Sequence, residues 1–224
     1  KSFSTGDWLK LSIKKINQIR NRKKIPILVG GTGLYFKALT NGLVKIPKIS
    51  KKKRETVSYL QKKLGQIIFY KRLLKLDPKI DQIIHPNDIQ RSIRAYEVKK
   101  YTKKSLFDYM KDTKSNFDDS VFEKLFINTP KDLLKKKIEN RVEKMFKDGV
   151  VEEAVNFYKI NIDKDLPSNK IIGIKEIRDY LSGKNTLMKT KELIKQKTRQ
   201  YAKRQFTWSR GHMKSWQMIY SSDL

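Results

Sequence analysis

The sequence predicts an α/β protein whose parallel-sheet core is interrupted by a helical insertion. Residues 25–29 form a short apolar run without charge, and a glycine-rich turn follows, which is typical of a buried strand in a parallel sheet. From about residue 50 to 119 the strand signals disappear and helical periodicity takes over, until an apolar run at 125–127 indicates a return to the sheet. We therefore expect residues 1–47 and 120–224 to form the α/β core and residues 48–119 to form the insertion.

The chain begins with a helix that leads into this strand. Ser4 and Asp7 have the spacing of a capping box. The apolar residues that follow at helical spacing are Trp8, Leu9, Ile13, Ile16 and Ile19. Together with the strand and the helix after it, this gives one α-β-α unit of a parallel sheet.

The turn after the strand is the first candidate site. Gly30, Gly31 and Gly33 remove three side chains, so backbone amides could approach a substrate closely, and Thr32 keeps one hydroxyl among them. Polar groups at the carboxyl end of such a strand lie where open α/β sheets bind ligands. The alternative is a tight strand-to-helix turn without chemistry, and the pattern alone does not decide between them.

The insertion is predicted to be all-helical. Pro47 and the charged run at 48–54 mark its start, and Val57, Leu60 and Leu64 recur on one helix face. Further along, Asn87 or Asp88 can cap a helix that carries an exposed polar face. That face holds Gln90, Arg91 and Arg94. A Gln amide can read a base edge, and an Arg can bind phosphate or stack on a base.

The last third returns to the core. Residues 129–149 read as a helix with an apolar stripe, beside which Arg141 lies. Residues 192–210 form the last long helix, in which basic and aromatic residues interleave as in binders of single-stranded nucleic acid. The aromatic residues can equally pack in a core. Residues 216–219 are predicted to form a closing strand.

Composition points to a polyanionic partner. The chain of 224 residues has 52 Lys and Arg against 23 Asp and Glu, a net charge of +29. Compositional drift can explain much of the Lys excess. The clustering of the scarcer arginines is more informative, because a guanidinium binds phosphate bidentately.

Several classes of protein are excluded or disfavoured. There is no Cys and there are only two His, which excludes disulfides, thiolate metal sites and multi-histidine metal sites. No apolar run is long enough to cross a membrane and no signal peptide is evident, so a cytoplasmic location is expected.

Three stretches resemble one known family. They are Val-Gly-Gly-Thr-Gly-Leu-Tyr-Phe-Lys-Ala-Leu-Thr-Asn-Gly-Leu at 29–43, His-Pro-Asn-Asp-Ile-Gln-Arg-Ser-Ile-Arg-Ala-Tyr-Glu at 85–97 and Thr-Arg-Gln-Tyr-Ala-Lys-Arg-Gln-Phe-Thr-Trp at 198–208. In this order they are similar to the signatures of bacterial tRNA dimethylallyltransferases, the isopentenyl-tRNA transferases.

The resemblance implies a fold and an activity. The fold would be a P-loop NTPase-like parallel sheet with an inserted all-helical tRNA-binding subdomain. The activity would be transfer of a dimethylallyl group from dimethylallyl diphosphate to N6 of the adenine 3′ of the tRNA anticodon, assisted by Mg²⁺. The family's phosphate loop and its acidic general base have no counterpart here, since no G-x-x-x-x-G-K-[ST] pattern occurs. We therefore expect an N-terminally incomplete, inactive chain whose metal ligands lie outside it.

The resemblance also implies roles for individual residues. Thr32 and Arg141 would be catalytic, and Gly30, Gly31 and Gly33 would bind substrate. The tRNA-binding residues would be Arg54, Gln90, Arg91, Ser92, Ile93, Arg94, Lys170, Ile171, Ile172, Gly173, Ile174, Lys175, Arg199 and Lys203. Lys170 and Ile174 depart from the family pattern, which commonly has Arg and an aromatic residue there. For Arg54 and Arg141 the alternative is a solvated surface charge.

Two other functions remain open at this point. An adenylate isopentenyltransferase would use a free nucleotide instead of tRNA, and a basic RNA-binding module would have no catalytic activity. The helical insertion and the Gln90–Arg94 face favour tRNA as the partner. A monomer is expected.

Overall fold

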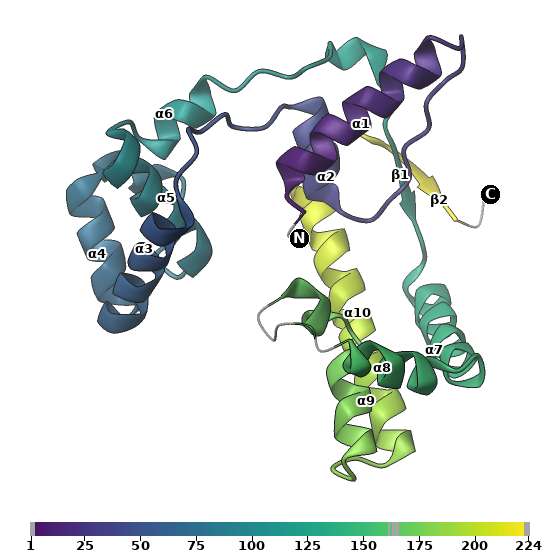
Figure 1. Cartoon of the computed structure of the whole chain (residues 1–224). Coiled ribbons are helices and arrows are strands. Elements are labelled where there is room, and N and C mark those ends of the chain that lie inside the picture. The colour runs from purple at the N-terminus through teal and green to yellow at the C-terminus, as the bar shows by residue number, and fades with distance from the viewer. Residues whose placement is uncertain (1–2, 161, 163–165, 222–224) are drawn as a thin grey trace. The chain divides into compact units, whose positions relative to one another are not determined.

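The computed structural model describes residues 3–160, 162 and 166–221, which are mainly helical with a small parallel sheet (Figure 1). The chain divides into two compact units, one made of residues 1–36 with 120–224 and one made of residues 37–119. Each unit has its own cluster of buried apolar side chains.

The unit of residues 37–119 is helical throughout its regular structure. Its elements are α3 (Lys51–Leu64), α4 (Gln66–Leu76), the 3-10 helix η1 (Pro78–Gln82), α5 (Ile89–Thr102) and α6 (Leu106–Lys111). Helices α3, α4 and α5 pack against one another in pairs. Their shared core consists of Val57, Phe69, Tyr70, Leu73, Ile80, Ile84, Ala95 and Tyr96.

The predicted apolar face of α3 is confirmed by this packing. Val57 is fully buried, and Leu60 and Leu64 pack against the same cluster. At the start of α5 the predicted cap is confirmed as well, because the Asp88 carboxylate accepts the Arg91 N–H at 3.0 Å.

The unit of residues 1–36 and 120–224 contains both described strands. Strands β1 (Leu125–Asn128) and β2 (Gln217–Tyr220) pair in parallel, with Leu125 opposite Gln217. Both strands confirm the predictions from the short apolar runs at residues 125–127 and 216–219. The 3-10 helix η2 (Asp119–Val121) precedes β1.

The first helices of the chain also follow the sequence pattern. Helix α1 (Thr5–Arg20) starts with the predicted capping box, in which Ser4 and Asp7 exchange hydrogen bonds of 3.2 and 3.0 Å. Helix α2 (Gly33–Thr40) begins at the last glycine of the glycine-rich turn. Trp8 of α1 stacks on Tyr35 of α2 with ring centroids 4.6 Å apart.

Four helices and a 3-10 helix complete this unit. They are α7 (Lys131–Lys147), α8 (Val150–Lys159), η3 (Pro167–Lys170), α9 (Ile174–Leu181) and α10 (Leu187–His212). Helices α7 and α9 pack on α10, which has 26 residues and is drawn in yellow-green in Figure 1. The core of helices α7 to α10 consists of Val142, Ala154, Ile177 and Ile194.

The predicted strand at residues 25–29 is wrong. This segment has no regular structure, and its apolar side chains Ile25, Ile27 and Val29 are 86%, 83% and 90% exposed. A strand is stable only when a neighbour satisfies its backbone groups. Within the described residues, β1 and β2 pair with each other and neither pairs with this segment.

Candidate functional site

The glycine-rich turn is anchored on α10. The Gln205 side-chain amide donates a hydrogen bond of 2.9 Å to the Gly31 carbonyl. A Cβ at Gly33 would lie 2.0 Å from the Trp208 ring, and one at Gly31 would lie 2.3 Å from the Gln205 amide nitrogen. Two of the three glycines are therefore explained by the close approach of α10. Gly30 is not, because its nearest neighbour is a Phe36 ring atom at 3.9 Å.

Thr32 lies at the exposed tip of this turn. Its carbonyl accepts the Tyr35 N–H at 2.9 Å, which starts α2. Its hydroxyl makes no hydrogen bond within the described residues, so it is available to a ligand. Docking on α10 fixes the backbone on which this hydroxyl is carried.

The anchoring predicts a large effect of adding one methyl group at Gly33. Gly33→Ala should lower the free energy of unfolding by about 1–3 kcal/mol, because its Cβ would overlap the Trp208 indole. Gly211→Ala is the control, since nothing lies within 4 Å of its Cβ and Ala favours a helix by up to about 1 kcal/mol. Urea unfolding followed by tryptophan fluorescence measures both. Equal stability of the two variants would contradict the packing described.

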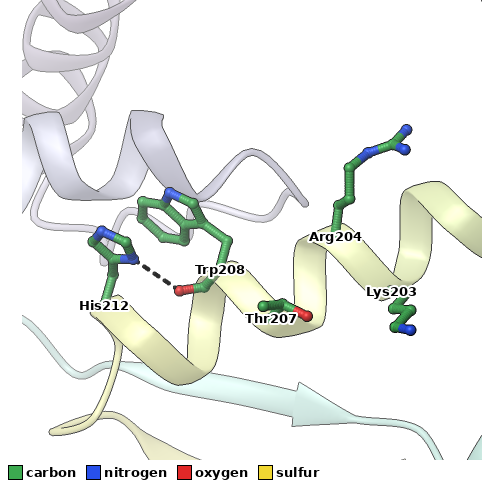
Figure 2. Close-up of a pocket in the computed structure, with 5 residues that line it drawn as sticks. All are labelled: Lys203, Arg204, Thr207, Trp208 and His212. Carbon is green, nitrogen blue, oxygen red and sulfur yellow. Dashed lines mark hydrogen bonds between the residues drawn. The ribbon is translucent and has the colours of Figure 1, made fainter. Parts of the chain in front are cut away.

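Beside the turn, α10 carries an open pocket of about 450 Å³ (Figure 2). It is lined by Lys203, Arg204, Thr207, Trp208 and His212. The Trp208 and His212 rings stack at 4.3 Å, and His212 Nδ1 lies 3.0 Å from the Trp208 carbonyl oxygen. The pocket thus combines an aromatic surface with two cationic side chains, a combination suited to a nucleobase or a phosphate group.

In the helical unit, the predicted residues of α5 divide into exposed and buried ones. Gln90 and Arg91 are exposed, and Arg91 pairs with Asp88 at 3.2 Å. Ser92 is fully buried; its hydroxyl donates to the Asp88 carbonyl at 2.6 Å and accepts from Gln66 at 3.2 Å. Ile93 packs against the core. The structure therefore gives Ser92 and Ile93 internal contacts.

Two further arginines converge in the same unit. Arg94 Nη1 lies 3.1 Å from Glu97 Oε2, and Arg54 Nε lies 3.8 Å from the same oxygen. Arg54 comes from α3 and Arg94 from α5, so one carboxylate joins two helices. Glu97 was not predicted as functional, although it ends the stretch at residues 85–97.

The segment 170–175 is held by a second buried carboxylate. Gly173 adopts φ +108°, and its N–H donates to Glu176 Oε2 at 2.9 Å. Glu176 also accepts from Lys197. Burial disfavours ionisation of Glu176, but the bonds from Lys197 and the Gly173 N–H outweigh burial and hold its pKa below the usual value. Glu176 was not predicted as functional.

The predicted side chains of the same segment divide into exposed ones and ones with internal contacts. Lys170, Ile171 and Lys175 are exposed. Ile172 instead packs against the core between α7 and α10, and the Ile174 carbonyl accepts from the Tyr158 hydroxyl. A left-handed backbone at Gly173 favours glycine at this position.

Arg141 and the basic residues of α10 complete the predicted set. Arg141 is exposed on α7, and within the described residues no hydrogen bond or ion pair joins it to the turn at residues 30–33. Arg199 is half-buried and Lys203 is exposed on α10, and Lys203 also lines the pocket. Of the two predicted catalytic residues, only Thr32 lies on the turn anchored to α10.

Metal binding and membrane spanning find no support in the described residues. Among the described residues, no group of three or more acidic, His or Cys side chains could hold a metal ion. No described helix is both long and apolar enough to span a membrane.

Comparison with known proteins identifies the chain's relatives. The model of the IPP transferase family matches residues 1–212. A tRNA dimethylallyltransferase from Pelagibacter ubique is 56% identical over 96% of this chain and 68% of its own length. One from Rickettsia massiliae is 42% identical over 94% of this chain and 58% of its own length.

Solved structures agree with these relatives. A eukaryotic dimethylallyltransferase acting on tRNA superposes with a TM-score of 0.78 at 26% identity, over 98% of this chain and 57% of that one. A tRNA isopentenylpyrophosphate transferase from Bacillus halodurans gives a TM-score of 0.62 at 31% identity, over 98% of this chain and 68% of that one. The chain thus spans roughly three fifths to two thirds of the length of these relatives. On this evidence the chain belongs to the IPP transferase family.

Proposed function

We propose that this chain serves in a tRNA dimethylallyltransferase, which transfers a dimethylallyl group from dimethylallyl diphosphate to N6 of the adenine 3′ of the anticodon. The observation that carries the proposal is the family match over residues 1–212, together with relatives named for this activity. The proposal includes a P-loop NTPase-like sheet core, an inserted helical subdomain that binds the anticodon stem-loop, Mg²⁺ as the metal of the reaction, and a cytoplasmic monomer.

The chemistry is a substitution at an allylic carbon. A bond forms from the adenine amine to that carbon as the carbon–oxygen bond to diphosphate breaks, and the amine loses a proton to a base. The Thr32 hydroxyl is free to hydrogen-bond the amine or the bridging oxygen, and the Arg141 guanidinium would offset charge on the diphosphate. The glycine turn at 30–33 would hold Thr32 against the substrate.

Recognition of tRNA would come from cationic and aromatic side chains. Gln90, Arg91, Arg94 and Arg54 belong to the helical unit, and Arg199 and Lys203 belong to α10. A stacked adenine must be drawn out of its loop to react, and an aromatic surface such as that of Trp208 and His212 suits an unstacked base.

A transfer assay tests the proposal and separates its two rivals. Residues 1–224 would replace the matching part of the Pelagibacter ubique relative, and the chimera would receive labelled dimethylallyl diphosphate with Mg²⁺ and either unmodified tRNA or AMP. Label in tRNA supports the proposal. Label in AMP alone would favour an adenylate isopentenyltransferase, and tRNA binding without any transfer would favour a non-catalytic RNA-binding module.

Arg91 offers a test of tRNA recognition on the chain itself. Arg91→Ala should weaken tRNA binding and reduce the slope of log affinity against log salt by about one unit, as expected for one lost phosphate contact. The matched control is Lys79→Ala, which removes the same charge from an exposed lysine of the same unit paired with Asp108. Filter binding at several salt concentrations measures both. An Arg91→Ala variant with the slope of the control would show that Arg91 does not contact the backbone.

A further inference from the structure

Glu97 is a buried carboxylate that faces two exposed arginines. Its side chain is only 4% exposed, whereas those of Arg54 and Arg94 are 62% and 40% exposed. A buried carboxylate is stable only when it is paired, so Glu97 draws both guanidinium groups towards one point. The two arginines come from different helices, α3 and α5.

The contacts with Glu97 use only part of each guanidinium group. A guanidinium has five N–H donors in a planar fork, and each of the two approaches Glu97 through one nitrogen, Nη1 of Arg94 and Nε of Arg54. Their remaining N–H groups are available to solvent or to an anion. The two guanidinium cations lie 3.1 and 3.8 Å from the same Glu97 oxygen, and without that carboxylate they would repel each other.

The surroundings of the pair are also basic. Lys53 of α3 and Lys100 of α5 both approach the Tyr101 ring, at 4.9 and 5.6 Å from its centre. Lys51 on α3 pairs with the exposed Glu55. A phosphate group is a ligand that two guanidinium groups can bind together, and both helices that carry them also carry lysines.

We propose that Glu97 is a positioning residue that joins Arg54 and Arg94 into a single phosphate-binding site for the tRNA backbone. The inference rests on the proposed function, because tRNA supplies the phosphate. It adds that the two arginines act as one unit, and that an acidic residue strengthens the binding of a polyanion.

Glu97→Gln tests this proposal because positioning and general electrostatic attraction predict opposite changes in tRNA affinity. The substitution raises the net charge, so general electrostatic attraction alone predicts tighter tRNA binding. Loss of positioning predicts the opposite, an affinity lower by about tenfold. The control is Glu55→Gln, which makes the same charge change at an exposed carboxylate of α3 and should leave the affinity equal or slightly higher.

A double-mutant comparison separates positioning from a purely structural role. In an Arg54→Ala/Arg94→Ala background, Glu97→Gln should no longer weaken binding, because it has no guanidinium left to position. An equal loss in both backgrounds would overturn the inference. Circular dichroism establishes that each variant is folded. If Glu97→Gln does not fold, Glu97→Asp replaces it. This variant keeps the charge but shortens the side chain, and it should also weaken binding only while both arginines are present.

The outcomes also separate this inference from the proposed function. Failure of the unsubstituted chain to bind tRNA would count against the function itself. If the unsubstituted chain binds tRNA and the folded Glu97→Gln variant binds it equally well or more tightly, only the role of Glu97 is overturned. If both Glu97 variants unfold, Glu97 holds α3 on α5, and the inference that it positions the two arginines is overturned as well.

Discussion

Phe69→Ala should lower the free energy of unfolding of the helical unit by about 3–5 kcal/mol, the usual range for truncating a buried Phe. Phe69 is fully buried at the centre of the core of α3, α4 and α5, and its ring lies 5.1 Å from that of Tyr96. Truncation leaves a cavity that neighbouring helices fill only in part. Urea unfolding and amide hydrogen exchange of α3–α5 would measure the loss.

The neighbouring residue supplies the control. Ile68→Ala removes an apolar side chain of α4 that is 59% exposed, and it should change stability by less than about 0.5 kcal/mol. Domain stability is commonly about 5–15 kcal/mol, so Phe69→Ala alone could leave the unit unfolded. Phe69→Leu, which keeps more of the buried volume, should then give a smaller loss in the same direction. Equal effects at positions 68 and 69 would contradict the core described.

Local sequence patterns predicted several elements because short-range interactions determine them. The capping box of Ser4 and Asp7, the Asp88 cap of α5 and the apolar face of α3 all lie within one or two helical turns. Such signals can be read from neighbouring residues alone. The same holds for the short apolar runs that form β1 and β2.

The predicted strand at residues 25–29 is wrong for the opposite reason, because a strand depends on long-range pairing. An apolar run has the composition of a buried strand, but pairing with a distant segment decides whether a strand forms. In the described residues no segment pairs with this run, and Val29 is 90% exposed. Composition therefore predicted a strand in a segment that has no pairing partner among the described residues.

The structure gives two of the glycines a packing role that the sequence could not show, while binding of substrate by Gly30, Gly31 and Gly33 stays a prediction. A side chain at Gly31 would overlap Gln205, and one at Gly33 would overlap Trp208. The residues in contact are far apart in the chain, and only the tertiary structure brings them together. The roles of Thr32, Arg141 and the tRNA-binding residues remain predictions.

Thr32→Ala should lower the turnover of prenyl transfer by about 10²–10³, with a much smaller change in tRNA affinity. One hydrogen bond that forms mainly in the transition state has an effect of this size. The Thr32 hydroxyl is exposed and has no hydrogen-bond partner in the described residues, so removing it disturbs no internal contact. The turn that carries it stays fixed through the bond from Gln205 to the Gly31 carbonyl.

Single-turnover kinetics in the chimera with the Pelagibacter ubique relative would measure this effect, with tRNA affinity followed separately by filter binding. Thr32→Ser is the matched control, because it keeps the hydroxyl and should retain most of the rate. If the reaction needs the methyl group instead, Thr32→Ser and Thr32→Ala would be equally slow.

Gln205→Ala removes the anchor of the turn and leaves Thr32 in place. It should lower the rate by less than Thr32→Ala, because part of the population still presents the hydroxyl. Unchanged turnover in Thr32→Ala with a collapse of tRNA affinity would show that Thr32 binds tRNA or supports the turn and has no part in the chemical step.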